Sequence, residues 1–336
     1  MAATKRILVT GVGGAPGFDL TRHLMALGCE VIAADADPLA CGLALQGVVP
    51  LVLPTADDPD YAFRLLEACG GMRPDGLLST VEHELPVLVC LRPELTRLGA
   101  RTWLPHMDAV MACIDKAAFY AVLSSRQIPT PATFLPHELD EAPARHPLVV
   151  KPRRGQGTQG VHFCETRQQA QVLCQLVPDP IVQERIHGQE FTADCLVDHA
   201  GRTSVVLRHR LLVKAGLSMV SRTFHDEEVA DQVTRTLEAL GMVGPCCAQG
   251  FICEDSNDDQ RVIMTEVNAR FAGAFPLAEA AGAALVQQTL NGLFDEPIDH
   301  DRLTYKPDIY LIKCFETLVS GTWHPAAVSY AHEREG

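Results

Sequence analysis

The chain has 336 residues, 47% hydrophobic and 21% charged, which is the composition of a soluble globular protein with room for two or three domains. Its formal net charge of −14 argues against a protein that wraps nucleic acid or lies on an anionic membrane. No apolar run approaches the ~20 residues of a membrane span. A predicted strand begins close to Met1, so we expect no signal peptide and a cytoplasmic protein.

The 12 cysteines are irregularly spaced and include no CxxC pair. This spacing favours small reduced core residues over a zinc site.

The first predicted element is an apolar strand at residues 6–10, followed by a glycine-rich turn and a helix to about residue 27. A second strand ends on Asp35. This strand–helix–strand order predicts a parallel sheet with right-handed crossovers. The alternation continues through strands at about 48–53 and 76–80, so we expect an open doubly wound domain of roughly 100 residues.

The glycine-rich turn also fits another class of protein. The pattern Thr10-Gly11-x-x-Gly14-x-x-Gly17 followed by Asp35 fits the dinucleotide fingerprint of extended short-chain dehydrogenases. Those enzymes need a Tyr-x-x-x-Lys pair, and none of the five tyrosines has a lysine four residues on. An NAD-dependent dehydrogenase therefore stays a minor alternative, and the other interpretation of the glycines is a tight strand–helix turn.

A basic, glycine-rich loop follows the predicted buried strand 148–150. Lys151, Arg153 and Arg154 stand at its mouth, and three glycines follow within six residues. Glycines let the backbone approach a ligand closely with its N–H groups turned inward, and the three cations suit a polyphosphate. The chain contains no Gly-Lys pair, so this is not a P-loop. A flexible basic hairpin loop is the alternative.

Two later segments carry further candidates. A helical pattern over residues 106–127 contains Asp115-Lys116, and a predicted strand over 262–267 runs into Glu266-Val267-Asn268-Ala269-Arg270. Glu266 and Asn268 are two apart on a strand, so their side chains face the same way. A carboxylate and an amide oxygen suit Mg²⁺. A solvated strand end is the alternative.

The order of these segments resembles the ATP-grasp superfamily, most closely single-unit members similar to the large subunit of carbamoyl phosphate synthetase. The resemblance implies an α/β and α+β architecture, in which an N-terminal doubly wound, Rossmann-like domain precedes the ATP-grasp fold. Four parts are implied: a pre-ATP-grasp domain, an N-terminal subdomain with a glycine-rich flap, a C-terminal subdomain with a metal site, and an unassigned segment. Their expected bounds are 1–105, 106–190, 191–303 and 304–336.

The resemblance also implies roles for individual residues. ATP-binding residues are implied to be Lys116, Lys151, Gly155, Gly157, Thr158, Gly160, Glu184, Arg185, Ile186 and Glu190, with 184–186 as the adenine hinge and Glu190 as the ribose-binding acid. The residues implied to bind Mg²⁺, or Mn²⁺ in its place, are Gln249, Glu266 and Asn268. The residues implied to act in catalysis are Arg270, Lys151 and Lys214.

The implied activity is that of an ADP-forming carboxylate–amine ligase, in which ATP activates the carboxylate of an amino acid as an acyl phosphate for attack by an amine. We expect small-molecule substrates and no nucleic-acid or membrane partner, and we leave a homodimer open.

The candidates to bind the substrate carboxylate and the departing phosphate, or else to be surface residues of a strand, are Arg208, Arg210, Lys214, Ser218 and Arg222. Candidates for the amine, or else helix N-terminal acids, are Glu82 and Glu84. The alternatives are a carbamoyl-phosphate-type acyl phosphate synthase and a non-catalytic nucleotide-binding module.

Overall fold

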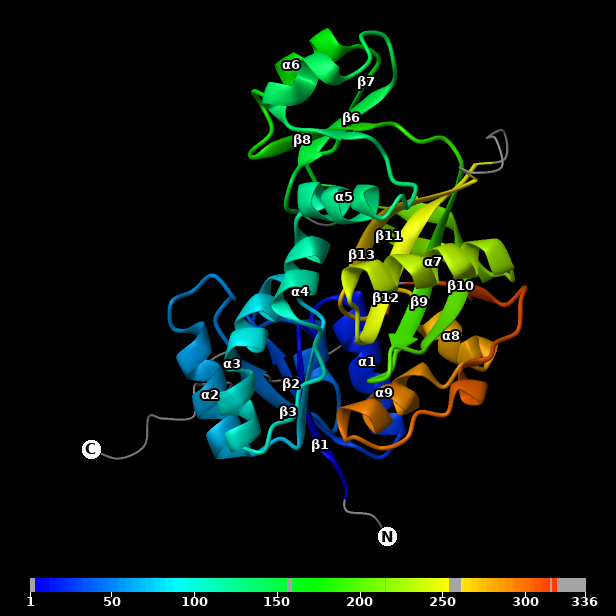
Figure 1. Cartoon of the computed structure of the whole chain (residues 1–336). Helices are drawn as coiled ribbons and strands as arrows, with labels where there is room; N and C mark the ends of the chain where they lie inside the picture. The colour runs from blue at the N-terminus through cyan, green and yellow to red at the C-terminus, as the bar shows by residue number, and fades with distance from the viewer. Residues whose placement is uncertain are drawn as a thin grey trace.

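The computed structural model describes residues 4–155, 157, 159–214, 216–253, 261–314 and 316–318. Within these residues the strands form three sheets, two of four strands and one of six. Figure 1 shows one four-stranded sheet with its helix standing apart from the rest, above the other two sheets.

The first sheet is parallel, with the strand order β3-β2-β1-β4. Helices cover both of its faces, since Leu8 packs into the core of α2 and α3 while Ile7 and Val9 pack into that of α1. This arrangement confirms the predicted doubly wound domain. The elements are β1 (Arg6–Thr10), α1 (Ala15–Ala26), β2 (Glu30–Asp35), β3 (Val49–Val52), α2 (Tyr61–Met72), β4 (Gly76–Ser79) and α3 (Leu85–Arg97).

The glycine-rich turn between β1 and α1 is a tight strand–helix turn. A Cβ at Gly17 would lie 2.1 Å from the carbonyl oxygen of Gly11, so only glycine fits there. Asp35 closes the turn, because its carboxylate accepts a hydrogen bond of 2.7 Å from the Gly13 N–H. Asp35 is therefore engaged by its own loop, whereas the dehydrogenase alternative would need it to bind a ribose hydroxyl.

The helical pattern predicted for residues 106–127 is interrupted at Asp115. One helix, α4 (Met107–Ile114), ends there and a second, α5 (Lys116–Ser125), begins. Asp115 caps α5, since its Oδ1 accepts hydrogen bonds from the N–H groups of Ala117 and Ala118. The break places Lys116 at the first position of α5.

The second sheet carries the glycine-rich loop. Its strand order is β5-β8-β6-β7 with antiparallel neighbours, and α6 (Arg167–Leu173) packs against it. Lys151 lies near the end of β6, where the loop begins. The strands are β5 (Thr133–Phe134), β6 (Leu148–Pro152), β7 (His162–Cys164) and β8 (Pro180–Glu184).

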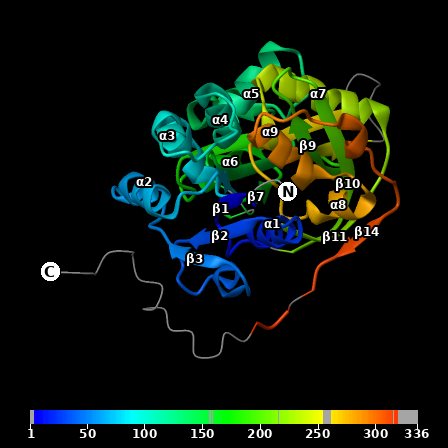
Figure 2. The same cartoon turned by 90° about the horizontal axis from the view of Figure 1, so that it is seen from below.

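The third sheet is antiparallel, with the order β13-β12-β9-β10-β11-β14. Helix α7 (Glu227–Leu240) packs into the core on one face, and α8 (Pro276–Ala281) and α9 (Leu285–Leu293) pack into the core on the other. Figure 2 shows α2 and α3 at one side of the molecule and β14 at the other. The strands are β9 (Gln189–Val197), β10 (Thr203–Lys214), β11 (Leu217–Thr223), β12 (Gly244–Ile252), β13 (Val262–Asn268) and β14 (Tyr310–Ile312).

The C-terminal segment left unassigned from the sequence contributes to this sheet. Strand β14 pairs antiparallel with β11 and forms the edge. The predicted boundaries at 105, 190 and 303 stay predictions, and one continuous core joins the first and third sheets through residues such as Leu8 and Phe191. Among the described residues, no helix has the length and apolarity needed to cross a membrane.

A Ser-His-Asp group joins the β9–β10 hairpin to the short helix η5 (His300–Leu303). The Ser204 Oγ lies 2.7 Å from His300 Nδ1, and His300 Nε2 lies 3.1 Å from an oxygen of Asp198. His300 is buried, and none of the three residues lines either of the two cavities described below. We interpret the group as a structural clasp.

Replacing Asp198 by asparagine should lower the free energy of unfolding by about 1–2 kcal/mol at pH 7. Burial alone would raise the pKa of Asp198, but hydrogen bonds from His300 and from the Arg202 and Ala200 N–H groups outweigh it and lower the pKa. The stabilisation is therefore present above the unfolded pKa and is lost as the pH falls through the lower folded pKa. Urea unfolding at pH 7 and at pH 3 should show the larger difference between Asp198→Asn and the unaltered protein at pH 7; an equal difference would contradict this account.

Candidate active site

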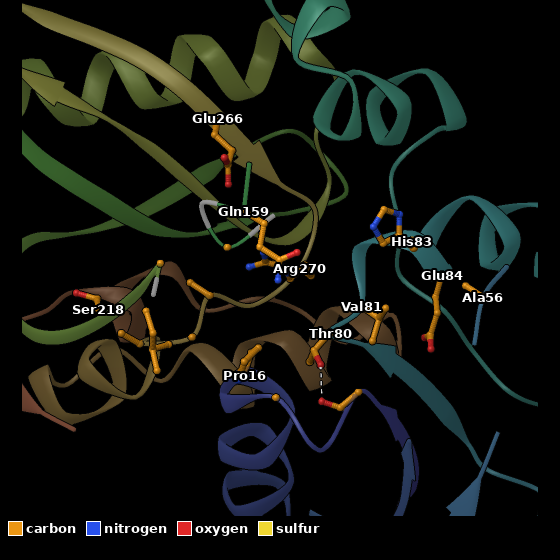
Figure 3. A pocket seen from close by; sticks show the side chains of 18 of the residues that line it. Pro16, Ala56, Thr80, Val81, His83, Glu84, Gln159, Ser218, Glu266 and Arg270 are labelled. Atoms are coloured by element: carbon orange, nitrogen blue, oxygen red, sulfur yellow. Dashed lines mark hydrogen bonds between the residues drawn. The ribbon is translucent and has the colours of Figure 1, made fainter. Parts of the chain in front are cut away.

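Two cavities meet between the three sheets. A smaller one, of about 420 Å³, lies between the flap-bearing sheet and the six-stranded sheet, and a larger one, of about 1150 Å³, lies between the six-stranded sheet and the carboxyl ends of the parallel strands. Figure 3 shows the larger cavity with Glu266 and Arg270 on one side and Pro16 and Thr80 on the other. Residues common to both linings are Gly157, Gln159, Arg210, Gln249 and Glu266.

Both predicted phosphate-binding lysines line the smaller cavity. The Lys116 ammonium donates a hydrogen bond of 2.8 Å to the carbonyl oxygen of Gly155. Desolvation, and then the positive charge of Lys116, lower the pKa of Lys151 to about 8, against the opposing effect of Glu266. The two lysines and Glu266 are thus close enough to affect one another electrostatically, as a shared phosphate site requires.

The two arginines of the basic loop are not available to a phosphate in this structure. Arg153 Nε lies 2.7 Å from one carboxylate oxygen of Asp115, and an amino group of Arg154 lies 3.3 Å from the other. Burial favours a raised pKa for Asp115, but the bond from Arg153, with those from backbone N–H groups, lowers its pKa. Of the three cations predicted at the mouth, only Lys151 faces the cavity without a carboxylate partner among the described residues.

The other end of the smaller cavity holds the predicted adenine and ribose residues. Glu184, Arg185, Ile186 and Glu190 all line it, beside the ring of Phe163. The Arg185 guanidinium lies 4.7 Å from the centre of that ring. Flat apolar and cationic surfaces of this kind suit an aromatic base.

Glu266 and Asn268 face the same side of β13, as their spacing predicts. The Asn268 amide nitrogen donates to Glu266 Oε1 at 2.7 Å, and an Arg270 amino group donates to the Asn268 amide oxygen at 3.0 Å. Glu266 lines both cavities, whereas Asn268 is buried behind it and lines neither. Gln249 lies opposite Glu266 in the ladder between β12 and β13 and lines both cavities.

This donor set fits magnesium that is shared with phosphates. The described residues contain no group of three His, Cys, Asp or Glu side chains able to hold a metal by themselves. Magnesium is usually held by one or two carboxylates together with substrate phosphates. Glu266 and Gln249 offer a carboxylate and an amide oxygen at the point where the two cavities meet, and Asn268 supports Glu266 from behind through its amide nitrogen.

The two arginines predicted on β10 are already paired with carboxylates from β9. Arg208 is 2% exposed and donates to Asp194 at 2.8 Å and 3.4 Å. Arg210 donates to Glu190, to Gln249 at 2.9 Å and to the carbonyl oxygen of Gly216 at 2.8 Å. Asp194 carried no signal in the sequence, because its contact with Arg208 depends on how β9 and β10 pair.

Arg270 differs from these arginines because no carboxylate among the described residues pairs with it. Its N–H groups donate to Asn268, to the carbonyl oxygen of Phe271 at 3.1 Å and to the sulfur of Cys247 at 3.7 Å. Arg270 lines the larger cavity. Its uncompensated charge is therefore available to an anionic group of a substrate there.

Of the other predicted residues, Lys214, Arg222 and Gly160 line neither cavity, whereas Ser218 lines the larger one. Lys214 is exposed at the end of β10, and Arg222 faces Asp308 at 3.6 Å; neither lines a cavity. Ser218 lines the larger cavity and shares a hydrogen bond of 2.8 Å with Ser221. Gly160 packs near Pro152 and does not line either cavity. Thr158 lies outside the described residues.

The glycine-rich loop lies against the turn between β10 and β11. A Cβ at Gly216 would lie 2.9 Å from the backbone of Gly157. Gly155 and Gly157 line the smaller cavity, and Gly157 has φ +66°, a left-handed conformation that favours glycine. The loop therefore covers the junction of the two cavities, as a flap would.

Replacing Gly157 by valine should slow turnover about tenfold, because a β-branched residue is strained at this φ. The measurement is kcat for ADP release. Gly201→Val is a matched control: Gly201 has φ +87° in the distant β9–β10 turn, and this change should reduce stability without changing kcat. Equal kcat for Gly157→Val and the unaltered protein would show that the loop does not close on the phosphates.

The comparisons with known proteins agree with the motif order. Residues 113–274 match the sequence profile of the ATP-grasp domain. These residues form an ATP-grasp domain. No curated protein matched the sequence significantly. The closer likeness to carbamoyl phosphate synthetase stays a prediction.

Solved structures show the same fold at low sequence identity. Biotin carboxylase of Campylobacter jejuni, solved in complex with β-γ-ATP, aligns with a TM-score of 0.72 at 12% identity, over 92% of this chain and 74% of that one. The L-amino acid ligase of Bacillus licheniformis aligns with a TM-score of 0.68 at 21% identity, over 91% of this chain and 78% of that one. N5-carboxyaminoimidazole ribonucleotide synthetase of Thermus thermophilus aligns with a TM-score of 0.67 at 18% identity, over 87% of this chain and 79% of that one.

Proposed function

We propose that the protein is an ATP-dependent, ADP-forming ligase that joins the carboxylate of an amino acid to an amine. The observation that carries this proposal is the meeting of the two cavities at Arg210, Gln249 and Glu266. A nucleotide in the smaller cavity would present its γ-phosphate at this junction. A carboxylate in the larger cavity would meet it there, next to Arg270. The structural likeness to an L-amino acid ligase supports the same substrate class.

In this proposal, the residues of the smaller cavity bind the nucleotide and those of the larger cavity bind the carboxylate. Lys116 and Lys151 hold the phosphates, and Arg270 holds the carboxylate and the charge that develops during transfer. Glu266, with Gln249 and Asn268, would hold Mg²⁺, which supplies positive charge to the phosphate oxygens. Lys214, exposed at the end of its strand, has no part in this scheme.

The reaction proceeds in two substitutions. A carboxylate oxygen attacks the γ-phosphorus, the bond to the ADP oxygen breaks, and an acyl phosphate forms. The amine nitrogen then attacks the acyl carbon, and the C–O bond to phosphate breaks. An ammonium substrate loses two protons in forming the amide, one to the departing phosphate and one to solvent. The flap at Gly157 keeps water from the acyl phosphate.

Trapping with hydroxylamine tests the proposal without knowledge of the amine. The protein, Mg-ATP and hydroxylamine are incubated with each of the twenty amino acids, and ADP and hydroxamate are measured. Hydroxamate formed in proportion to ADP supports an acyl phosphate of that amino acid. Bicarbonate-dependent ADP release with no amino acid requirement would favour the carbamoyl-phosphate-type alternative. ATP binding with no ADP release under any condition would favour the non-catalytic module.

A further inference from the structure

The lining of the larger cavity includes a buried hydroxyl group without a partner in the described part of the chain. Thr192 of β9 is 2% exposed and lines this cavity, and no described residue exchanges a hydrogen bond with its hydroxyl group. Its neighbours Phe191 and Ala193 pack into the core beneath α7 on the other face of the sheet, so the Thr192 side chain faces the cavity. Buried polar groups normally have a hydrogen-bond partner, so this hydroxyl group is suited to a ligand.

Arg208 of β10 lies beside Thr192 and presents unused donors to the same cavity. The two residues are directly opposite each other in the β9–β10 ladder, so their side chains share one face of the sheet. Arg208 lines the cavity and donates from Nε and Nη2 to Asp194, at 2.8 Å and 3.4 Å. An arginine has five N–H donors, and those on Nη1 form no hydrogen bond with a described residue. Asp194 therefore fixes one edge of the guanidinium and leaves the other edge for a ligand.

This pair of donors is close to the proposed reaction site but separate from it. The ladders place four paired residues in one row across the sheet, in the order Glu266, Gln249, Thr192 and Arg208. Thr192 is two strands from Glu266, about 10 Å at the usual strand spacing. Two extended residues of a peptide span about 7 Å. A second charged group of an amino acid substrate, or of a second amino acid joined to it, would therefore reach Thr192.

Resting on the proposed function, we propose that Arg208 and Thr192 bind a second substrate carboxylate, distinct from the carboxylate that reacts beside Arg270. The unused edge of the guanidinium and the hydroxyl group supply the donors that a carboxylate needs. Arg270 donates to the sulfur of Cys247, which lies opposite Asp194 in the β9–β12 ladder, so the two arginines flank one small region of the cavity. The second carboxylate belongs either to an attacking amino acid or to the side chain of an acidic amino acid that is activated.

The test has two arms, one for each source of the carboxylate. In the first arm, hydroxamate formation with Mg-ATP and hydroxylamine is compared for L-aspartate against L-asparagine and for L-glutamate against L-glutamine. In the second arm, the amino acid that supports most hydroxamate is activated without hydroxylamine, and amide formation is compared for glycine against glycinamide and for L-alanine against L-alaninamide. In one of the arms, kcat/KM of the unaltered protein should favour the carboxylate over the amide by about 100-fold.

Two variants connect this preference for the carboxylate to the site. Thr192→Val keeps the shape of the side chain and removes its donor, so the preference should fall about tenfold. Arg208→Lys keeps a positive charge beside Asp194 but lacks the planar edge of donors, so the preference should fall at least as far. Thermal unfolding establishes which variants fold, and if Thr192→Val does not, Arg208→Lys decides.

Matched controls make the same exchanges away from the site. Thr203 of β10 also has a buried hydroxyl group with no partner among the described residues, and it lines neither cavity. Arg261 likewise forms an ion pair with an aspartate, Asp226, outside both cavities. Thr203→Val and Arg261→Lys should leave the preference for the carboxylate unchanged.

The results separate this inference from the proposed function. A preference in the first arm assigns the site to an acidic side chain, and one in the second arm assigns it to the attacking amino acid; either supports the site if the variants reduce it. Hydroxamate formation with no preference in either arm, or a preference that the folded variants leave unchanged, would overturn the second site and leave the ligase reaction standing. No hydroxamate from any amino acid would refute the ligase reaction, and this inference with it.

Discussion

Replacement of Glu266 by glutamine is expected to lower turnover by about 10²–10³-fold, the scale of removing one electrostatic contact to a transition state. Glu266 is the carboxylate that lines both cavities. Glutamine keeps the shape and can still accept the hydrogen bond that Asn268 donates. The loss should therefore come from the missing charge, which would otherwise hold magnesium against the phosphates. The loss of turnover is measured as the rate of ADP release with the amino acid that supports hydroxamate formation.

The dependence on magnesium distinguishes this role from a structural one. In Glu266→Gln, half-maximal activity should require a higher Mg²⁺ concentration, while the midpoint of thermal unfolding should change little. Glu94→Gln, which removes an exposed carboxylate on α3, should alter neither quantity. Near-normal turnover of Glu266→Gln at low Mg²⁺ would exclude Glu266 from the metal site.

The sequence was informative about the fold where a pattern is local. The apolar run at residues 6–10 and the glycine turn after it specify β1 and α1, because strand burial and tight turns depend on neighbouring residues. The split of the helical pattern at Asp115 and the edge strand β14 were missed. A cap of two N–H groups and a three-residue strand leave weak periodic signals, and β14 depends on pairing with a distant strand.

The candidate site shows the same division. Lys116, Lys151 and Glu266 were chosen from the residues beside them, and the structure brings all three to one cavity. The sequence could not predict which charged side chains form ion pairs, because these pairs join residues on different elements of the fold. Arg208 meets Asp194 across two strands. Glu84 is bound by Ser79 and lines the larger cavity, whereas Glu82 lines neither cavity. Lys214 lies only four residues from Arg210, yet it is at the exposed end of the strand and does not line the cavity.

Lys151 should make nucleotide binding depend strongly on pH. Desolvation and the charge of Lys116 lower its pKa to about 8 in the free protein, so the ammonium that a polyphosphate needs is lost as the pH rises through that value. Bound phosphates favour the charged form and raise the pKa again. Between pH 7 and pH 9.5 the affinity for Mg-ATP should therefore fall by roughly 30-fold, provided that the bound pKa stays above 9.5.

Replacing Lys151 by methionine removes both the charge and its titration. The affinity for Mg-ATP at pH 7 should fall on the order of 10²-fold, as when one partner of a buried charge pair is removed. The remaining affinity should vary far less with pH. Calorimetric titration at pH 8 in two buffers of different ionisation enthalpy should show proton uptake on binding by the unaltered protein and much less by Lys151→Met. Equal proton uptake by the two proteins would assign the linkage to another group and would leave Lys151 without the proposed role.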